Sequence, residues 1–308
     1  MTVRRTGSEG MGGSSLTQTT PTDVYQWDHP PGQLSQGSIL LVHGTAPVNI
    51  DGIIPGCTPK YPLGMMPTYR ELSEVLTGGG WSTLRYTRPG ISQDSVDWDQ
   101  YMKVDHDAII DQLNRLFQLM PREKPRVVFC WSGGSLHVPH LPLSEAQALI
   151  IVGGISTNRF HNGAMMAGAR HANQAAQANQ AVQAAPVLRW QETIAEVEAF
   201  ADMTYEEIAA INKPNGDGPL IRFWQECRLK DNWTYFQKFV ELPILVLQGA
   251  EDAEVHATQA RLWQQLLPYH KITLVEKPDG DHFLGINNQN GAANVGAEIL
   301  RWLAEVLR

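Results

Sequence analysis

Cysteine is scarce in this chain, with three cysteines among 308 residues. Three are too few for a disulfide framework, which argues against a fold held together by bridges. We expect Cys130 to be buried within a strand, and Cys57 and Cys227 to be free thiols. A bridge between Cys57 and Cys227, which lie far apart in the sequence, is the alternative.

Basic charge and long apolar runs are lacking as well. The chain has 24 Lys and Arg against 32 Asp and Glu and shows no basic stripe, so we expect no nucleic-acid partner. No apolar run follows the two arginines near the start, so the sequence predicts neither a secretion signal nor a membrane span. A cytoplasmic location without a membrane partner is the default expectation. Residues 1–20 are rich in Gly, Ser and Thr and are predicted to form a mobile segment.

The most informative stretch that is present runs from Arg126 to Gly134, where an apolar strand leads directly into Ser132 and two glycines. A sharp turn of this kind holds a serine in a strained backbone conformation and lifts its hydroxyl clear of a sheet. The reference pattern is G-x-S-x-G, whereas Cys130 fills the first small position here. Cysteine is compact enough for the turn to form. Alone, the pattern is a weak signal for a nucleophile.

Three further segments are predicted to be buried strands that end in polar residues. They begin at Ser38, Leu242 and Lys271, and they lead to His43, to Asp252 and, through a turn over residues 278–281, to His282. Ser132, Asp252 and His282 therefore follow one another along the chain, each on a loop after a strand. This is the chain order of the triad in α/β-hydrolases.

With these motifs, residues 22 to 308 outside a middle insertion resemble the α/β-hydrolase superfamily, in its lidded serine esterase/lipase-like branch. The resemblance implies an α/β fold with a mostly parallel central sheet flanked by helices. It implies a core of residues 21–154 and 241–308, with a helical lid inserted over residues 155–240. The strand–helix alternation is interrupted over that insertion, where the family places its lid.

The chemistry of a serine nucleophile assigns roles to the three residues. A serine hydroxyl is weakly nucleophilic at neutral pH and needs an adjacent base, for which His282 is the best candidate. Asp252 would orient the imidazole and stabilise its charged form. His256 is the alternative base, and Glu251 and Glu254 are the alternative acids.

Backbone groups beside the serine complete the predicted site. The N–H of Gly133 is expected to be one oxyanion donor, because it follows the nucleophile. The loop after His43 should supply the second, with Thr45 as the first choice and Ala46 as the second. Three aromatic residues are predicted to bind substrate: Trp131, Trp190 and Trp224.

The remaining histidines have simpler interpretations. His43 is expected to shape the oxyanion loop, while His137 and His140, just after the serine, are expected to pack rather than to line the pocket. His161 and His171 lie in the insertion without metal-ligand spacing. We therefore expect no metal and no organic cofactor.

These expectations converge on a serine hydrolase that cleaves a carboxylic ester of a small or medium apolar molecule through an acyl-enzyme. A thioesterase, an amidase or peptidase, and a carbon–carbon hydrolase remain open, because the fold hosts them all with the same triad. A non-catalytic ligand receptor is the alternative of another class. Dehalogenases and epoxide hydrolases are disfavoured, since those relatives have an aspartate where this chain has Ser132. A homodimer is left open.

The other segments alternate between expected strands and helices. Strands are predicted at 24–27, 81–86 and 148–153, and helices at 69–76, 97–120 and 295–307. Pro139 and Pro142 are expected to keep the helix after Ser132 short.

Overall fold

The computed structural model describes most of the predicted core. The described residues are 23–56, 66–101, 103–158, 161–162, 165–166, 231–285 and 289–308, with the backbone of 2–5 and 15–19. Trp190, Trp224, His171, Cys57 and Cys227 lie outside them, as does most of the predicted lid. Among the described residues, no helix combines the length and the apolarity that a membrane span requires.

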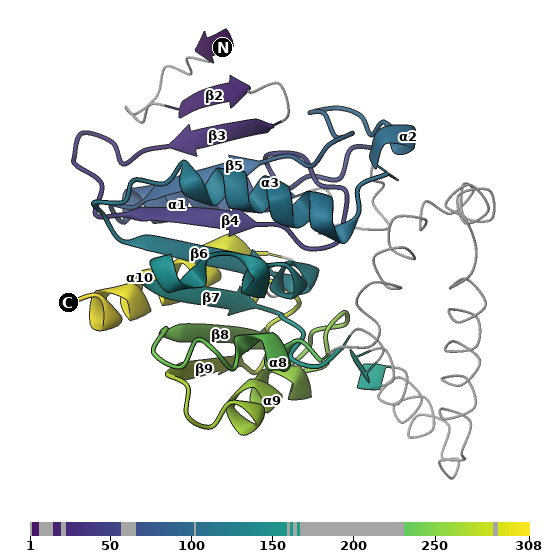
Figure 1. Ribbon diagram of the computed structural model, residues 1–308, viewed down its shortest axis with the longest axis vertical. Helices are drawn as coiled ribbons and strands as arrows, with labels where there is room; N and C mark the ends of the chain where they lie inside the picture. Colours follow the sequence, from purple (N-terminus) through teal and green to yellow (C-terminus); the bar gives the residue numbers. More distant parts are fainter. Residues whose placement is uncertain are drawn as a thin grey trace.

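The core is a nine-stranded sheet with the strand order β1-β2-β3-β5-β4-β6-β7-β8-β9 (Figure 1). In chain order the strands are β1 Thr2–Arg5, β2 Ser15–Thr19, β3 Val24–Asp28, β4 Ser38–Val42, β5 Ser82–Tyr86, β6 Arg126–Trp131, β7 Ala148–Val152, β8 Ile244–Gly249 and β9 Ile272–Lys277. From β5 to β9 all neighbours pair in parallel, whereas β1, β2 and β3 form an antiparallel extension. The expected mostly parallel α/β sheet is confirmed.

The central strands β4, β6, β7 and β8 are buried along their whole length. Parallel strands covered on both faces are expected to be continuous apolar runs, which is how these segments read in the sequence. Val42 at the end of β4 pairs with Cys130 in β6, and Val152 at the end of β7 pairs with Leu247 in β8. The loops that follow these strands therefore leave from one edge of the sheet.

Helices cover both faces of the sheet (Figure 1). On one face, α1 (Thr68–Gly78) and α10 (Gly291–Val306) pack together over a core that includes Leu72, Ile299 and Trp302. On the other face, α3 (His106–Gln118), the short α8 (Trp233–Phe236) and α9 (Thr258–Leu266) cover a second core. Successive strand residues point to opposite faces, so each central strand contributes to both cores.

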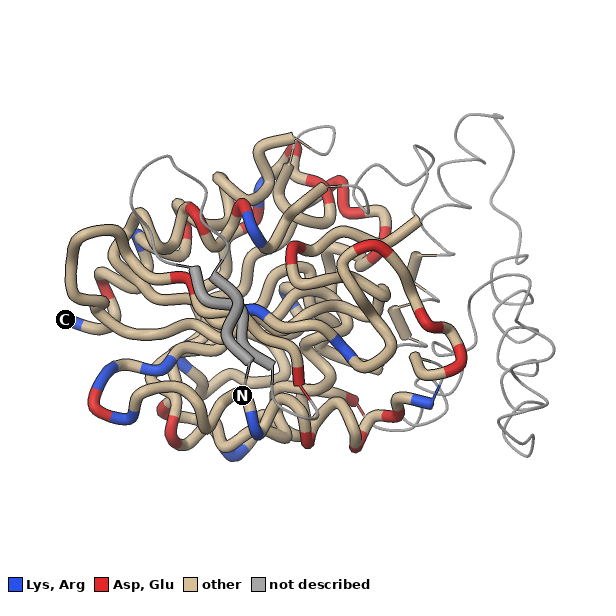
Figure 2. Tube along the Cα trace, turned by 90° about the horizontal axis from the view of Figure 1, so that it is seen from above, with Lys and Arg blue, Asp and Glu red and all other residues tan. Residues whose placement is uncertain are grey.

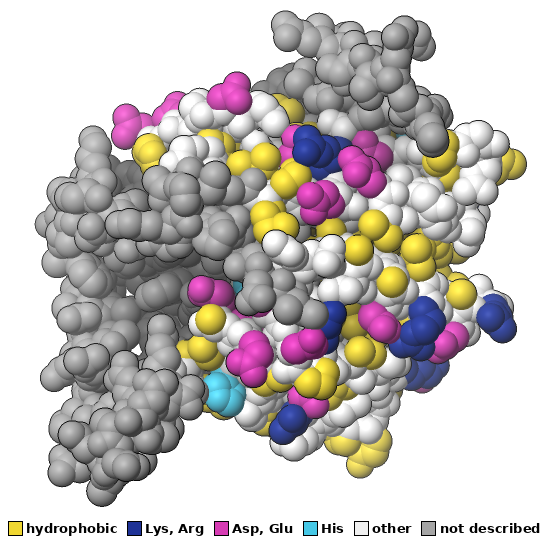
Figure 3. Space-filling view, turned by 180° about the vertical axis from the view of Figure 1, so that it is seen from behind, with side chains coloured by type: hydrophobic (Ala, Val, Ile, Leu, Met, Phe, Trp, Pro, Cys, Tyr) yellow, Lys and Arg dark blue, Asp and Glu magenta, His cyan; other side chains and the backbone are white. Residues whose placement is uncertain are grey.

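Charged side chains of both signs are interspersed over the described surface. Figure 2 shows Lys and Arg scattered among Asp and Glu along the chain, and Figure 3 shows the same mixture on the face seen from behind. Neither view shows a basic stripe on the described part, in line with the excess of acidic residues in the sequence.

The helix predicted over residues 97–120 is wrong as a single element. The structure has α2 (Trp98–Tyr101) and then α3, which begins only at His106. The reason is local: Asp105 accepts a hydrogen bond from the N–H of Ala108 at 2.8 Å and caps a new helix. Asp97 caps the shorter helix in the same way through Gln100.

Two strands lie within residues 1–20, where the sequence predicts a mobile segment. Strand β2 pairs with β1 and with β3, and the mobility of this segment stays a prediction. Thr17 and Thr19 are β-branched and suit a strand, although glycines surround them in the sequence.

Two helices near the C-terminus also differ from the prediction. Helix α10 starts four residues before the predicted Val295, and α9 was not predicted.

Candidate active site

Ser132 occupies a strained turn at the end of β6. Its φ is +53°, in the left-handed region that residues other than glycine rarely adopt. The side chain is 9 % exposed. A series of 3-10 turns follows in place of a long helix, over Ser132–Leu136, Val138–His140 and Leu143–Glu145. The predicted short helix after the serine is therefore confirmed, with Pro139 and Pro142 inside that region.

Small residues let the end of β4 approach this turn. A β carbon on Gly44 would lie 3.2 Å from Ser132 Cβ, and one on Gly134 would lie 2.6 Å from the carbonyl oxygen of His43. Cys130 points the other way, with its Sγ 3.4 Å from the carbonyl oxygen of Ile150 in β7. Burial raises the pKa of the Cys130 thiol far above its usual range, so this cysteine is an inert core residue.

Asp252 and His282 are in direct contact. Asp252, on the loop after β8, holds its Oδ2 2.8 Å from Nδ1 of His282, which follows β9. Its Oδ1 accepts the N–H groups of Glu254 and Val255, each at 2.8 Å, and Gln248 donates to Oδ2 at 2.9 Å. Burial opposes ionisation of Asp252, but His282 and the two backbone N–H groups outweigh it and lower the pKa of the carboxyl group. The carboxylate is thus held ionised against the imidazole.

Gly153 makes room for this pair. It follows β7 with a φ of +52°, and a β carbon there would lie 2.9 Å from His282 Nδ1 and 3.2 Å from Asp252 Oδ2. Gly153 was not predicted to be part of the site. The signal was available, since Gly153-Gly154 ends a buried strand next to the nucleophile strand.

Trp131 contacts His282 through a hydrogen bond and through its ring. Its indole Nε1 donates to the backbone oxygen of His282 at 3.0 Å, and the two rings lie 5.3 Å apart. The side chain is 8 % exposed and packs in the core with Tyr69 and Phe283. The fold thus places Trp131 against the backbone of His282, and its predicted contact with substrate stays a prediction.

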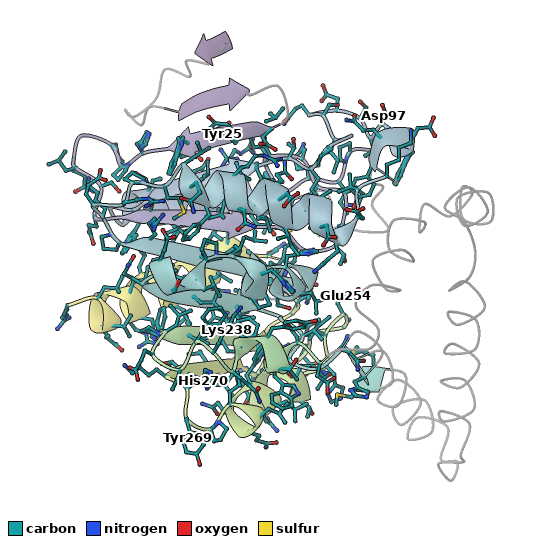
Figure 4. All side chains as sticks on the ribbon, in the orientation of Figure 1. Tyr25, Asp97, Lys238, Glu254, Tyr269 and His270 are labelled. Atoms are coloured by element: carbon teal, nitrogen blue, oxygen red, sulfur yellow. The ribbon has the colours of Figure 1, made fainter. Side chains whose placement is uncertain are left out.

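The alternative acids and base lie elsewhere. Glu251 and Glu254 are exposed, and Figure 4 shows Glu254 at the edge of the sheet where the parallel strands end. His256 Nδ1 accepts the N–H of Thr258 at the start of α9. The fold therefore brings Asp252 to His282 and leaves these three residues in other surroundings.

The oxyanion candidates face each other across two loops. A β carbon on Gly133 would collide with Cγ2 of Thr45 and would lie 3.4 Å from Thr45 N. Within the described part of the chain, the N–H groups of Gly133, Thr45 and Ala46 donate to no acceptor. Nearby, the ring of His43 stacks on Tyr86 at 4.3 Å. Burial, followed by the charge of Arg88, lowers the pKa of His43, so its ring is neutral and shapes the loop as expected.

His137 and His140 belong to a histidine cluster that also contains His106 of α3. His137 is fully buried, and its Nδ1 lies 3.1 Å from Nδ1 of His106. The ring of His106 meets that of His140 edge-on at 5.2 Å. The expected packing role fits this placement, although His106 was not foreseen. The described residues contain no group of three or more His, Cys, Asp or Glu side chains arranged to hold a metal ion.

The described ends of the predicted lid are anchored beside the serine turn. Nδ2 of Asn232 donates to the backbone oxygens of Ser135 and Ile155, at 3.0 and 2.7 Å. Oε1 of Gln259 accepts hydrogen bonds from Ser156 and Thr157. Both ends of the insertion therefore reach the edge of the sheet where Ser132 lies.

Comparisons with known proteins identify the fold. No protein-family model matches the sequence, and no curated protein matches it either. Solved structures do match. A soluble variant of monoglyceride lipase from Saccharomyces cerevisiae, in complex with a substrate analogue, is similar with a TM-score of 0.59 and 13% identity, covering 96% of this chain and 97% of that one.

Two esterases are similar to the same extent. An esterase from Pyrococcus furiosus matches with a TM-score of 0.56 and 12% identity over 99% of this chain and 97% of that chain. A thermophilic esterase from Thermogutta terrifontis matches with a TM-score of 0.54 and 16% identity over 94% and 97%. At these identities the likeness concerns the fold: this chain has the α/β-hydrolase fold.

Proposed function

We propose that the protein is a serine hydrolase that cleaves a carboxylic ester of a small or medium apolar substrate. The observation that carries the proposal is the 2.8 Å contact between Asp252 and His282, at the same sheet edge as Ser132 in its left-handed turn. A strained serine beside a carboxylate-bound imidazole is the arrangement that activates a hydroxyl nucleophile. The similarity to esterase and lipase structures supports this choice among hydrolases.

In the proposed mechanism, Ser132 Oγ attacks the ester carbonyl carbon while Nε2 of His282 accepts the hydroxyl proton. The contact with Asp252 favours the tautomer with hydrogen on Nδ1, which leaves Nε2 free to act as the base. The N–H groups of Gly133 and Thr45 stabilise the negative oxygen that forms. His282 then protonates the departing alcohol, and a water molecule activated by the same imidazole hydrolyses the acyl-enzyme. These residues carry the reaction without a metal or organic cofactor.

We further propose that residues 155–240 act as a lid that sets substrate choice, with Trp190 and Trp224 facing the substrate. The anchoring of Asn232 and of Ser156 beside the serine turn supports this role. One methylene more or less on a substrate in a hydrophobic pocket changes the specificity by about 10- to 200-fold. Trp190→Ala or Trp224→Ala should therefore change chain-length preference more than activity on an acetate ester.

The test is a series of p-nitrophenyl esters of increasing acyl length, measured beside acyl-CoA and aminoacyl substrates. We expect turnover of short and medium esters, and labelling of Ser132 by a fluorophosphonate probe. Preference for an acyl-CoA would turn the proposal into a thioesterase, and preference for an aminoacyl amide into a peptidase. A protein that is neither labelled nor active on any of them would instead fit a non-catalytic receptor.

A further inference from the structure

The loop that carries Thr45 is held by side chains from outside the proposed triad. The hydroxyl of Tyr101, in α2, donates to the backbone oxygen of Thr45 at 3.0 Å. Nη2 of Arg88, on the loop after β5, donates to the backbone oxygen of His43 at 3.3 Å. The backbone N–H of His43 in turn donates to the hydroxyl of Tyr86 at 3.4 Å. Three side chains thus bind backbone groups of His43 and Thr45, on either side of Gly44.

These bonds decide where the loop's N–H groups point. A trans peptide is planar, and its carbonyl and N–H groups point in opposite directions. The bond from Tyr101 to the oxygen of Thr45 therefore turns the N–H of Ala46 away from Tyr101. The bond from Arg88 to the oxygen of His43 does the same for Gly44, so the N–H of Thr45 lies between two fixed peptides. Both candidates for the second oxyanion donor depend on this network.

Arg88, which binds the backbone oxygen of His43 in this network, is a buried cation. Its side chain is 3 % exposed, and within the described chain no carboxylate lies within ion-pair distance of it. Its Nε has no hydrogen-bond partner, and its charge opposes the effect of burial, which raises the pKa of the hydroxyls of Tyr86 and Tyr101. A buried charge without a counter-ion is costly. A function that uses a positive charge behind the oxyanion loop explains its presence.

We propose that Arg88 and Tyr101 are positioning residues that hold the Thr45 loop in its oxyanion-binding conformation. The proposal rests on the proposed serine hydrolase function. Tyr101 acts through the backbone oxygen of Thr45, while Arg88 acts through the backbone oxygen of His43 and adds positive potential on the loop side of Ser132. Both residues act on the charged tetrahedral state and leave the bound ester in its ground state unaffected.

The first test is Tyr101→Phe, which removes only the hydroxyl. With p-nitrophenyl butyrate we expect kcat to fall about tenfold to a hundredfold, with KM changed less than about twofold, because a displaced donor loses part of the effect of a deleted one. The Ki of an alkyl trifluoromethyl ketone, whose adduct with the serine carries an oxyanion, should rise by the same factor as kcat falls. Tyr25→Phe is the control, since Tyr25 is also buried, at 3 % exposure, but lies on β3, where it pairs with Tyr86 in β5 and not with Thr45.

The second test compares two variants of Arg88. Arg88→Lys keeps the charge, and Arg88→Gln removes it. We expect the lysine variant to retain at least about fivefold more kcat than the glutamine variant, with matching changes in the ketone Ki. A purely structural residue would lower the melting temperature and the amount of active enzyme, and would leave the ratio of Ki to KM unchanged.

The outcomes separate this proposal from the one on which it rests. The positioning role would be overturned by two results together: folded Tyr101→Phe keeps the wild-type kcat and ketone Ki, and the two Arg88 variants have equal kcat. If Ser132→Ala is inactive in the same assays, the proposed serine hydrolase function still stands. If Tyr101→Phe does not fold, the comparison of the Arg88 variants decides alone. A wild-type protein with no esterase activity and no probe labelling at Ser132 overturns both proposals.

Discussion

Asp252 and His282, on the loops after β8 and β9, meet through a side-chain contact of 2.8 Å, whereas Gly133 and Thr45, on the loops after β6 and β4, lie close together and are proposed to act through their backbone N–H groups. The first pair depends on two side chains and on the space that Gly153 leaves. The second depends on peptide orientation, which side chains from β5 and α2 control from outside. The proposed acid–base chemistry therefore depends on residue type, while the proposed oxyanion binding depends on packing.

The largest effect is expected where both parts of the site converge, at Ser132. Ser132→Ala removes the nucleophile and should lower kcat for p-nitrophenyl butyrate by about 10⁴-fold or more. The measurement is steady-state turnover together with fluorophosphonate labelling followed by peptide mapping. Ser92→Ala, at an exposed turn, is the control and should retain wild-type activity. A probe adduct on any other serine would contradict the assignment.

On the acid–base side, Asp252→Asn should lower kcat by about 10³- to 10⁴-fold while the fold is retained. The amide has the size of the carboxylate, but it removes the charge that holds the imidazole in its productive tautomer. Circular dichroism checks the fold, and turnover gives the effect. Glu254→Gln is the matched control, because Glu254 is exposed beside the same loop. A larger loss in Glu254→Gln than in Asp252→Asn would require a different acid.

Gly153→Ala tests whether the side-chain pair depends on packing as the oxyanion loop does. The new β carbon would lie 2.9 Å from His282 Nδ1, and the φ of +52° would strain any side chain. A displacement of the imidazole by a fraction of an ångström should lower kcat/KM by about tenfold to a hundredfold. Gly78→Ala, where the added carbon meets nothing within 4 Å, is the control. Equal activity of the two variants would mean that the pair tolerates the shift.

The sequence predicts the residues of the proposed triad better than it predicts the side chains that support the oxyanion loop. The strands end where apolar runs end, so Ser132, Asp252 and His282 could be placed at one sheet edge from chain order alone. A single capping hydrogen bond from Ala108 to Asp105 begins α3 as a helix separate from α2. The apolar periodicity of residues 97–120 is continuous in the sequence, so it does not reveal this break. The bond from Tyr101 to Thr45 joins residues 56 positions apart and leaves no local pattern, so the support of the oxyanion loop could be seen only in the folded chain. Gly153 lies between these two cases. The sequence shows a double glycine after a strand, but only the folded chain shows that Gly153 lies next to His282 and Asp252.

The smallest expected effect concerns stability in acid, through the histidines behind the serine turn. Burial, and then the charge of His140, lowers the pKa of His106 to about 4, and burial lowers that of His137 well below its ordinary value. The aspartates at positions 105 and 107 oppose the shift of His106 without reversing it. Between about pH 6.5 and pH 4 the unfolded chain therefore binds more protons than the folded one, so the free energy of unfolding falls as the pH falls.

We expect each such histidine to contribute a slope on the order of 1 kcal/mol per pH unit over this window. Urea unfolding at intervals from pH 7 to pH 4.5 measures the slope. His106→Gln removes one of these titrating groups and should make the slope shallower, whereas His161→Gln, at a side chain that is 54% exposed, should leave it unchanged. Parallel slopes in wild type and His106→Gln would show that the cluster is not what makes the fold acid-sensitive. His106 would then bind its proton in the folded chain as readily as in the unfolded chain, and the cluster would pack behind the serine turn without adding to the acid sensitivity.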